Sequence, residues 1–248
     1  MNFTKEQATL SETKPLRYFD LILAVFVMVL IVSNVASSAK IIDWGVNLLG
    51  LPLAFDAGTL LFPISYIFGD VLTEVYGFKK ARKVIWIGFL CLAFSSFVFW
   101  LVRIMPAESS WQSMVGQDAY NAILVGMSSG GLVIASILGY LTGSFSNAIV
   151  MALVKSITRG KFLWVRTISS TLVGEFIDTA VFILIASLTN VFQWNLFWTL
   201  VITNYIFKVG IEVLMTPLTY LVVGRLKKGE GLDITDPGRD LNPFRFRS

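Results

Sequence analysis

The sequence predicts an all-α integral membrane protein with six transmembrane helices and both termini in the cytoplasm. Three observations support this fold class: the composition, six long apolar runs, and the distribution of basic residues between those runs. The 248 residues are 55% hydrophobic and only 15% charged, whereas a soluble domain usually carries about 25% charged residues. The mean hydropathy is +0.73, which leaves little room for a soluble domain.

Each apolar run is long enough to cross a hydrocarbon core of about 30 Å. The spans are expected at residues 18–39, 55–76, 84–104, 123–154, 165–188 and 196–223. The first run lacks a clear cleavage site, so we interpret it as a retained span. The fourth exceeds one straight crossing, and its glycines fit a bend, internal packing or a homodimer contact. The expected organisation is a cytosolic tail (1–17), a six-helix domain (18–224) and a basic cytosolic tail (225–248).

Basic residues predict the orientation. All but three of the 20 lysines and arginines lie in the two tails or in the loops after the second and fourth spans; the exceptions are Lys40, Arg103 and Lys208. Cytoplasmic loops carry such an excess, so both termini are expected inside. This topogenic bias also explains the net charge of +4. The expected partner is therefore the lipid bilayer and not nucleic acid.

The residue types that are missing exclude several kinds of chemistry. There is no histidine, and Cys91 is the single cysteine. Catalysis by Ser-His-Asp or Cys-His groups is therefore excluded, and the commonest metal ligand is missing. An intrachain disulfide is excluded as well. We expect no enzymatic activity, no metal site and no cofactor.

Seven ionisable residues lie in or at the edge of these apolar spans, and each charge near a bilayer centre costs about 2.5–3.5 kcal/mol on insertion scales. They are Asp70, Glu74, Arg166, Glu175, Asp178, Lys208 and Glu212. A chain that keeps so many charges is expected to bind or move a polar solute.

In the second span, Tyr66, Asp70 and Glu74 recur every four residues and share one helix face, with Thr73 beside it. Two carboxylates one turn apart fit a cationic substrate or a proton-coupled step. The alternative is a structural ion pair with Lys208 or Arg166.

The fifth and sixth spans repeat this pattern. Glu175 and Asp178 share a face of the fifth span, and Asn204, Lys208 and Glu212 recur every four residues in the sixth, with Tyr205 adjacent. Lys208 and Glu212 can also pair along their own helix. Arg166 is expected to snorkel to the cytosolic edge. The five acids outnumber these cations, so the surplus requires protons, water or a positively charged ligand.

Two weaker features add to this picture. In the first span, Asn34 fits either helix packing or hydrogen bonding to a heterocycle. The pattern Ser65-x-x-x-Gly69-Asp70 in the second span is echoed by Ser170-x-x-x-Gly174-Glu175 in the fifth. These are the middle spans of two three-span halves, as in transporters built from inverted repeats, although a chance match is an equal alternative.

Three segments carry a resemblance to a known family. Residues 62–77 (FPISYIFGDVLTEVYG), residues 169–179 (SSTLVGEFIDT) and residues 204–208 (NYIFK) resemble the signatures of the queuosine precursor transporters of the vitamin uptake transporter family. Residues 33–35 (SNV) fit the first span of that family. The match extends over about residues 21–225, in the family's order and spacing.

The resemblance implies import of a 7-deazaguanine, such as preQ0 or preQ1, across the bacterial plasma membrane for salvage into tRNA queuosine. Carboxylates would accept hydrogen bonds from the guanine-like edge or pair with an amine, and aromatic rings would stack on the planar base. The resemblance ranks Asp70, Asp178 and Lys208 first. The full set of expected substrate-binding residues is Asn34, Tyr66, Asp70, Thr73, Glu74, Glu175, Asp178, Asn204, Tyr205, Lys208 and Glu212.

The sequence is compatible with three functional hypotheses. The first is a secondary transporter for a planar nitrogenous solute, with the binding site near the membrane midplane. The second is the substrate-binding subunit of a vitamin importer energised by separate ATPases, since the chain has no Walker motif. The third is an intramembrane aspartyl protease, although Ile67-Phe68-Gly69-Asp70 lacks the first glycine of Gly-x-Gly-Asp.

Overall fold

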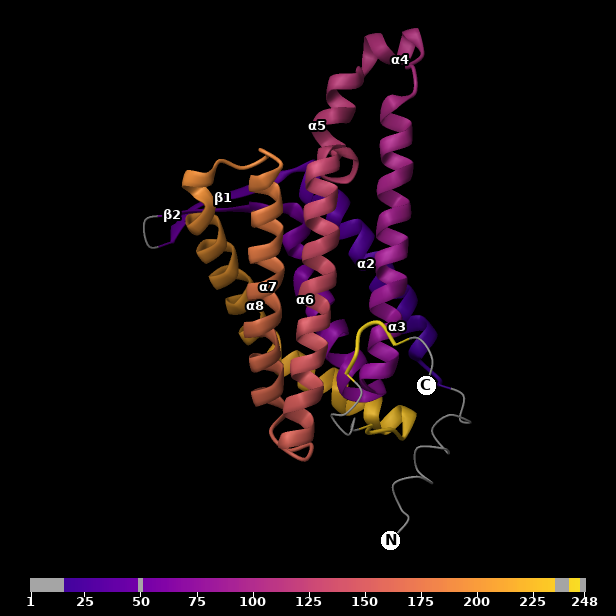
Figure 1. Cartoon of the computed structure of the whole chain (residues 1–248), viewed down its shortest axis with the longest axis vertical. Coiled ribbons are helices and arrows are strands. Elements are labelled where there is room, and N and C mark those ends of the chain that lie inside the picture. The colour runs from indigo at the N-terminus through magenta and orange to yellow at the C-terminus, as the bar shows by residue number, and fades with distance from the viewer. Residues whose placement is uncertain (1–15, 49–50, 235–240, 246–248) are drawn as a thin grey trace.

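The computed structural model describes residues 16–48, 51–234 and 241–245, which form a bundle of helices (Figure 1). Five stretches of this part are long and apolar enough to cross a membrane, as expected of a multi-pass membrane protein. The long helices are α2 (Phe19–Ala39), α3 (Phe62–Ile104), α6 (Gly130–Ile157), α7 (Leu163–Leu188) and α8 (Phe197–Glu230). The shorter elements are η1 (Ala57–Leu60), α4 (Ser109–Met114), α5 (Gln117–Ser128) and η2 (Trp194–Leu196).

The fold of the described residues is helical, as expected, except for one hairpin. Between α2 and η1, strands β1 (Ile41–Leu48) and β2 (Leu51–Asp56) form an antiparallel hairpin, in which Ile41 pairs with Asp56. The β-branched residues Ile41 and Ile42 favour an extended backbone. The hairpin lies away from the end of the bundle at which the chain starts (Figure 1).

Helix α3 contains the third expected span and the second from Phe62 onward, whereas the expected start of the second span, at residues 55–60, lies in β2 and η1. Its one break is at Gly77, where φ is 79° and ψ is 166°, a conformation that glycine adopts readily because it has no Cβ. The chain folds back at this point. In the arm before Gly77, Gly69 lies near Asn147 of α6, and Glu74 lies near Lys155, two turns farther along α6.

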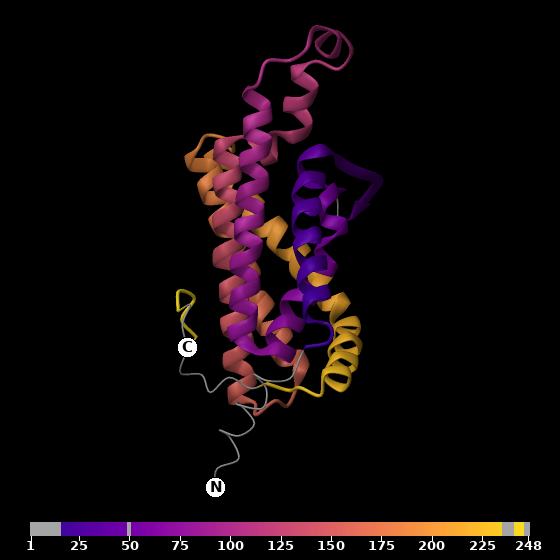
Figure 2. The ribbon, with the colours of Figure 1, turned by 90° about the vertical axis from the view of Figure 1, so that its right-hand side faces the viewer.

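After Gly77, the contacts run in the opposite direction along the bundle. The ring of Trp86 lies 5.9 Å from that of Phe145, and the backbone carbonyl of Ile85 accepts a hydrogen bond from Tyr140. Farther on, Arg103 reaches the carbonyl of Ser128. The two arms of α3 are therefore antiparallel, and the second arm leads to α4, which projects beyond the other helices (Figure 2).

The expected fourth span is divided at Ser129. Helix α5 ends at Ser128, Ser129 is extended (φ −85°, ψ 120°), and α6 begins at Gly130. The expected fifth span agrees closely with α7. Helix α8 runs beyond the expected sixth span to Glu230. It ends there because Gly231 adopts the left-handed conformation, which suits glycine.

The first helix of the described chain, α2, is joined to the last, α8, at one end of the bundle. The Glu230 carboxylate accepts hydrogen bonds from the backbone N–H groups of Arg17 (2.9 Å) and Tyr18 (2.7 Å) and from the hydroxyl of Tyr76 (2.9 Å). These bonds satisfy donors at the start of α2 that have no helical partner. We refer to this end, the lower one in Figure 1, as the basal end.

Candidate functional site

Helices α3, α6, α7 and α8 bring seven polar residues together inside the bundle. We call this group the central cluster; it consists of Asp70, Asn147, Thr171, Glu175, Asp178, Lys208 and Glu212. The cluster has four carboxylates and one lysine. Each member is tied to another by a hydrogen bond, an ion pair or an electrostatic interaction.

Close packing of α6 on α7 positions the cluster. A Cβ at Gly143 would lie 2.5 Å from the Cβ of Asp178, and one at Gly139 would lie 3.0 Å from an Asp178 carboxylate oxygen. The absence of a side chain at both positions lets the two helices approach this closely. The glycines of the expected fourth span thus serve internal packing, at least at these two positions.

Lys208 of α8 is bound to two acids of α7. Its Nζ lies 3.1 Å from Glu175 and donates a short hydrogen bond to Asp178. The alternative pairing of Lys208 with Glu212 along one helix is not what the structure shows, because the lysine side chain crosses to the neighbouring helix. The side chains of Lys208, Glu175 and Asp178 are 16%, 14% and 25% exposed.

The other acids of the cluster lie deeper. Asp70 of α3 is 2% exposed and Glu212 of α8 is 6% exposed. The Asn147 side chain of α6 lies close enough to Asp70 to interact with it, and the Thr171 hydroxyl of α7 makes a short hydrogen bond to Glu212. Glu212 also lies close enough to Asp70 and Glu175 for their charges to interact. The cluster therefore has a buried layer and a more accessible layer.

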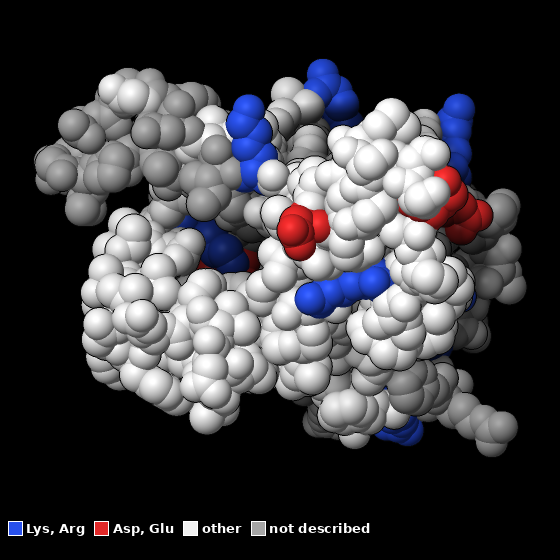
Figure 3. Space-filling view, turned by 90° about the horizontal axis from the view of Figure 1, so that it is seen from above, with Lys and Arg blue, Asp and Glu red and all other residues white. Residues whose placement is uncertain are grey.

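The space-filling view from the end opposite the basal end shows a hollow in this face of the molecule (Figure 3). Basic and acidic atoms lie at the floor of the hollow, between walls of uncharged side chains. A polar floor inside an apolar bundle is typical of a solute-binding site.

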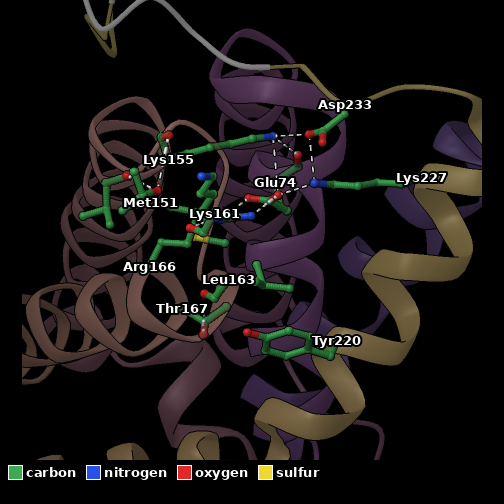
Figure 4. Close-up of polar contacts among 12 residues, drawn as sticks. Glu74, Met151, Lys155, Lys161, Leu163, Arg166, Thr167, Tyr220, Lys227 and Asp233 are labelled. Carbon is green, nitrogen blue, oxygen red and sulfur yellow. Dashed lines mark hydrogen bonds and ion pairs between the residues drawn. The ribbon is translucent and has the colours of Figure 1, made fainter.

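A second group of charges lies at the basal end, and we call it the basal cluster. It consists of Glu74, Lys155, Arg166, Lys227 and Asp233 (Figure 4). Glu74 is completely buried. Arg166 of α7 binds it through two parallel hydrogen bonds of 2.6 Å, from Nε to Oε2 and from Nη2 to Oε1. This bidentate geometry is the strongest form of an ion pair between side chains.

Two lysines complete the basal cluster. Lys155 of α6 donates to the Glu74 carbonyl (2.6 Å) and to the Asp233 carboxylate (2.7 Å). Lys227 of α8 makes a short bond to the Glu74 carboxylate and lies 2.8 Å from Asp233. Burial raises the pKa of Asp233, but the hydrogen bonds from Lys155 and Lys227 outweigh it, and the net pKa is lowered. Helices α3, α6, α7 and α8 are thus bound together around one carboxylate.

The basal cluster changes two expectations. Arg166 does not snorkel to an aqueous edge, because it is only 2% exposed and bound to Glu74. Glu74 and Asp70 lie one turn apart on α3, but Glu74 is surrounded by cations of the chain itself. The structural ion pair that was the alternative for Glu74 is therefore present.

The remaining expected site residues lie outside these clusters. Asn34 joins α2 to α6 by accepting a hydrogen bond from Ser136 (2.7 Å). Thr73 donates to the Gly69 carbonyl (3.2 Å) on its own helix, and Asn204 is exposed. The ring of Tyr205 packs edge-on against Phe176, and its hydroxyl interacts electrostatically with Glu175, so it borders the central cluster. The side chain of Tyr66 lies outside the described residues.

Sequence reasoning missed Asn147, Lys155, Lys227 and Asp233. Asn147 is a single amide in an apolar helix, with no second ionisable or amide residue at helical spacing to draw attention to it. The two lysines were interpreted as loop charges that orient the spans, because they lie near helix ends. Within the described residues, no group of three or more Cys, Asp or Glu side chains is arranged to hold a metal ion.

Residues 56–222 match the family described as "Putative vitamin uptake transporter". This chain belongs to that family. The matched region includes both clusters apart from Lys227 and Asp233, and the family assigns the chain a transport role rather than an enzymatic one.

Two relatives carry the same name, "Probable queuosine precursor transporter". The protein from Bacillus subtilis (strain 168) is 26% identical over 176 residues, which cover 71% of this chain and 73% of the relative. The protein from Haemophilus influenzae (strain ATCC 51907 / DSM 11121 / KW20 / Rd) is 26% identical over 168 residues, or 67% of each chain. No solved structure matches the chain.

Proposed function

We propose that this protein imports queuosine precursors, 7-deazaguanines such as preQ0 or preQ1, across the bacterial plasma membrane as a secondary transporter. The names of the two relatives support the substrate class. The observation that carries the proposal is the convergence of four carboxylates and Lys208, from helices α3, α7 and α8, on one cluster inside the bundle. An acid-rich pocket suits a solute whose edge is made of N–H donors.

The proposed topology has six crossings, with both termini in the cytoplasm. Because the arms of α3 are antiparallel, its 43 residues supply two crossings. The basal end carries Lys79, Lys80 and Arg82 near the fold of α3, together with the lysines of the basal cluster. The positive-inside rule therefore assigns this end to the cytoplasm. The echo around Gly69 and Gly174 supports inverted repeats, since both glycines face Asn147.

In this orientation the two clusters have different roles. Lys208, Glu175 and Asp178 are partly accessible and would meet the substrate first, while Asp70 and Glu212 would bind it deeper in the membrane. The basal cluster would close the cytoplasmic side in this conformation. Alternating access would require the bonds of Glu74 to break while the outer side closes.

The acid surplus of the central cluster also favours coupling of uptake to protons. A carboxylate would take up a proton on the outer side together with the substrate and release both inside, so an inward pH gradient would drive the cycle. Uptake should then fall when the gradient is collapsed, and an unchanged rate would reject the coupling.

The test of the function is queuosine content in tRNA. A strain that cannot synthesise queuosine precursors is fed preQ0 or preQ1, with and without this gene. Queuosine that appears only with the gene supports the proposal. No queuosine in either strain, with the protein present in the membrane, would reject it. The same strain without energising ATPases separates a secondary transporter from the subunit of an ATPase-driven importer.

A further inference from the structure

Two oxygen atoms in the buried layer of the central cluster lack a hydrogen-bond donor within the described part of the chain. Asp70 Oδ1 and Asn147 Oδ1 are both buried, and neither has a hydrogen-bond partner among the described residues. The Asn147 side chain lies close enough to the Asp70 carboxyl group to interact with it, so the two oxygens belong to adjacent groups. Both are acceptors, and an acceptor that is buried without a donor destabilises the folded protein.

Asn147 is held in place by two glycines on the neighbouring helices. A Cβ at Gly174 of α7 would lie 2.7 Å from the Cβ of Asn147, and one at Gly69 of α3 would lie 3.5 Å from its Nδ2. The asparagine is thus enclosed by the backbones of α3 and α7. An amide fixed in this way has little freedom to turn its oxygen toward another donor of the chain.

The surroundings of the pair contain further acceptors. Glu212 lies close enough to Asp70 for their charges to interact, and its carboxylate bonds to Thr171. Lys208 binds Glu175 and Asp178 on the other side of the cluster. The buried layer therefore requires donors from a ligand, whereas the ion pairs of the accessible layer are already formed.

We propose that Asn147 and Asp70 together bind two adjacent N–H donors of the substrate, the amide N–H and the exocyclic amine of a 2-amino-4-oxo pyrimidine ring. This inference rests on the proposed function and adds to it the residue that determines specificity. A base without the exocyclic amine would leave one of the two oxygens without a donor. Sites built to hydrogen-bond a substrate group reject analogues that lack it.

The test compares two compounds with the same ring system. Cells that express the protein take up radiolabelled 7-deazaguanine in competition with 7-deazahypoxanthine, which lacks the 2-amino group. We expect the wild type to prefer 7-deazaguanine at least about tenfold, and Asn147→Ala to lose most of this preference. Asn147→Asp, which keeps the size and an acceptor oxygen, should retain it. Asn195→Ala, at an exposed asparagine, is the matched control and should behave as the wild type.

The outcomes separate this inference from the function on which it rests. Uptake of neither compound by the wild type would overturn the proposed function and this inference together. Uptake of both compounds without preference would overturn only this inference. A fall in the uptake of both compounds in Asn147→Ala, with an unchanged ratio, would overturn it as well, because it would reveal a purely structural role. If Asn147→Ala does not reach the membrane, loss of the preference in the isosteric Asn147→Asp overturns it.

Discussion

The central and basal clusters contain similar residues but differ in how their charges are balanced. In the basal cluster, two carboxylates face three cations, and Glu74 accepts hydrogen bonds from Arg166 and Lys227. In the central cluster, four carboxylates face one lysine, and an Asp70 oxygen has no partner among the described residues. The comparison indicates that a buried charge supports the fold where the chain neutralises it, and is available for a ligand where the chain does not.

Asp70 and Glu74 show this difference most directly, because they lie one turn apart on the same arm of α3. Both are buried, and both point into the bundle. Their roles are decided by the helices opposite them. Arg166, Lys155 and Lys227 face Glu74, whereas Asn147 and Glu212 face Asp70. Isosteric neutralisation of each residue is therefore the sharpest way to test the comparison.

The largest effect on stability is expected for Glu74→Gln. Three cations would then face one another without the carboxylate that binds them. Breaking a buried ion pair by removing one partner costs about 3–5 kcal/mol. Thermal unfolding in detergent, with Lys161→Ala at an exposed side chain as the control, measures the loss. Wild-type stability of Glu74→Gln would contradict the structural role of the basal cluster.

For Asp70→Asn we expect the opposite pattern, with loss of uptake and retention of the fold. A hydrogen bond to a charged group is worth about 1.5–3 kcal/mol, so uptake should fall by at least about tenfold. Asp178→Asn and Lys208→Ala should also abolish uptake while the protein inserts normally. The measurement is uptake divided by the amount of protein in the membrane. Normal transport in all three variants would refute the proposed site.

An intermediate effect is expected where α6 packs on α7. In Gly143→Ala, the new Cβ would lie 2.5 Å from that of Asp178, and the helices would have to separate. Overpacking of this kind costs about 1–3 kcal/mol, and it would also displace an acid of the central cluster. Gly130→Ala is the matched control, because a Cβ there meets nothing within 4 Å. Equal unfolding temperatures for the two variants would contradict the close packing.

The smallest effect concerns Asp233. Its folded pKa is lowered, chiefly by the hydrogen bonds from Lys155 and Lys227 that outweigh burial, so its stabilising contribution is present above the unfolded pKa of about 3.9. That contribution is lost as the pH falls toward the lower, folded pKa. Asp233 is half-exposed, so its ion pairs are worth at most about 1 kcal/mol. The difference in unfolding temperature between wild type and Asp233→Asn should be constant from pH 5 to 8 and shrink below about pH 4. A difference that grows on acidification would contradict this assignment.

The sequence alone predicted the features that depend on local composition. Apolar runs identified the long helices, because a span must satisfy its backbone hydrogen bonds internally and present apolar side chains to lipid. Charged positions within the apolar spans identified five of the central residues, since a buried charge is costly wherever its helix packs. They are Asp70, Glu175, Asp178, Lys208 and Glu212. The hairpin of β1 and β2 was missed, because it is short and lies between two strong helical signals.

Only the tertiary structure decided which charges meet. Lys208 had an acid on its own helix at a favourable spacing, yet it binds Glu175 and Asp178 across the interface between α7 and α8. Arg166 and Lys155 had the pattern of loop charges, yet both reach Glu74 inside the bundle. Helix periodicity determines which side chains share a face, but partners on other helices depend on how closely the backbones approach. Here that approach is set by glycines such as Gly143 and Gly174, whose importance appears only when the opposing residue is known.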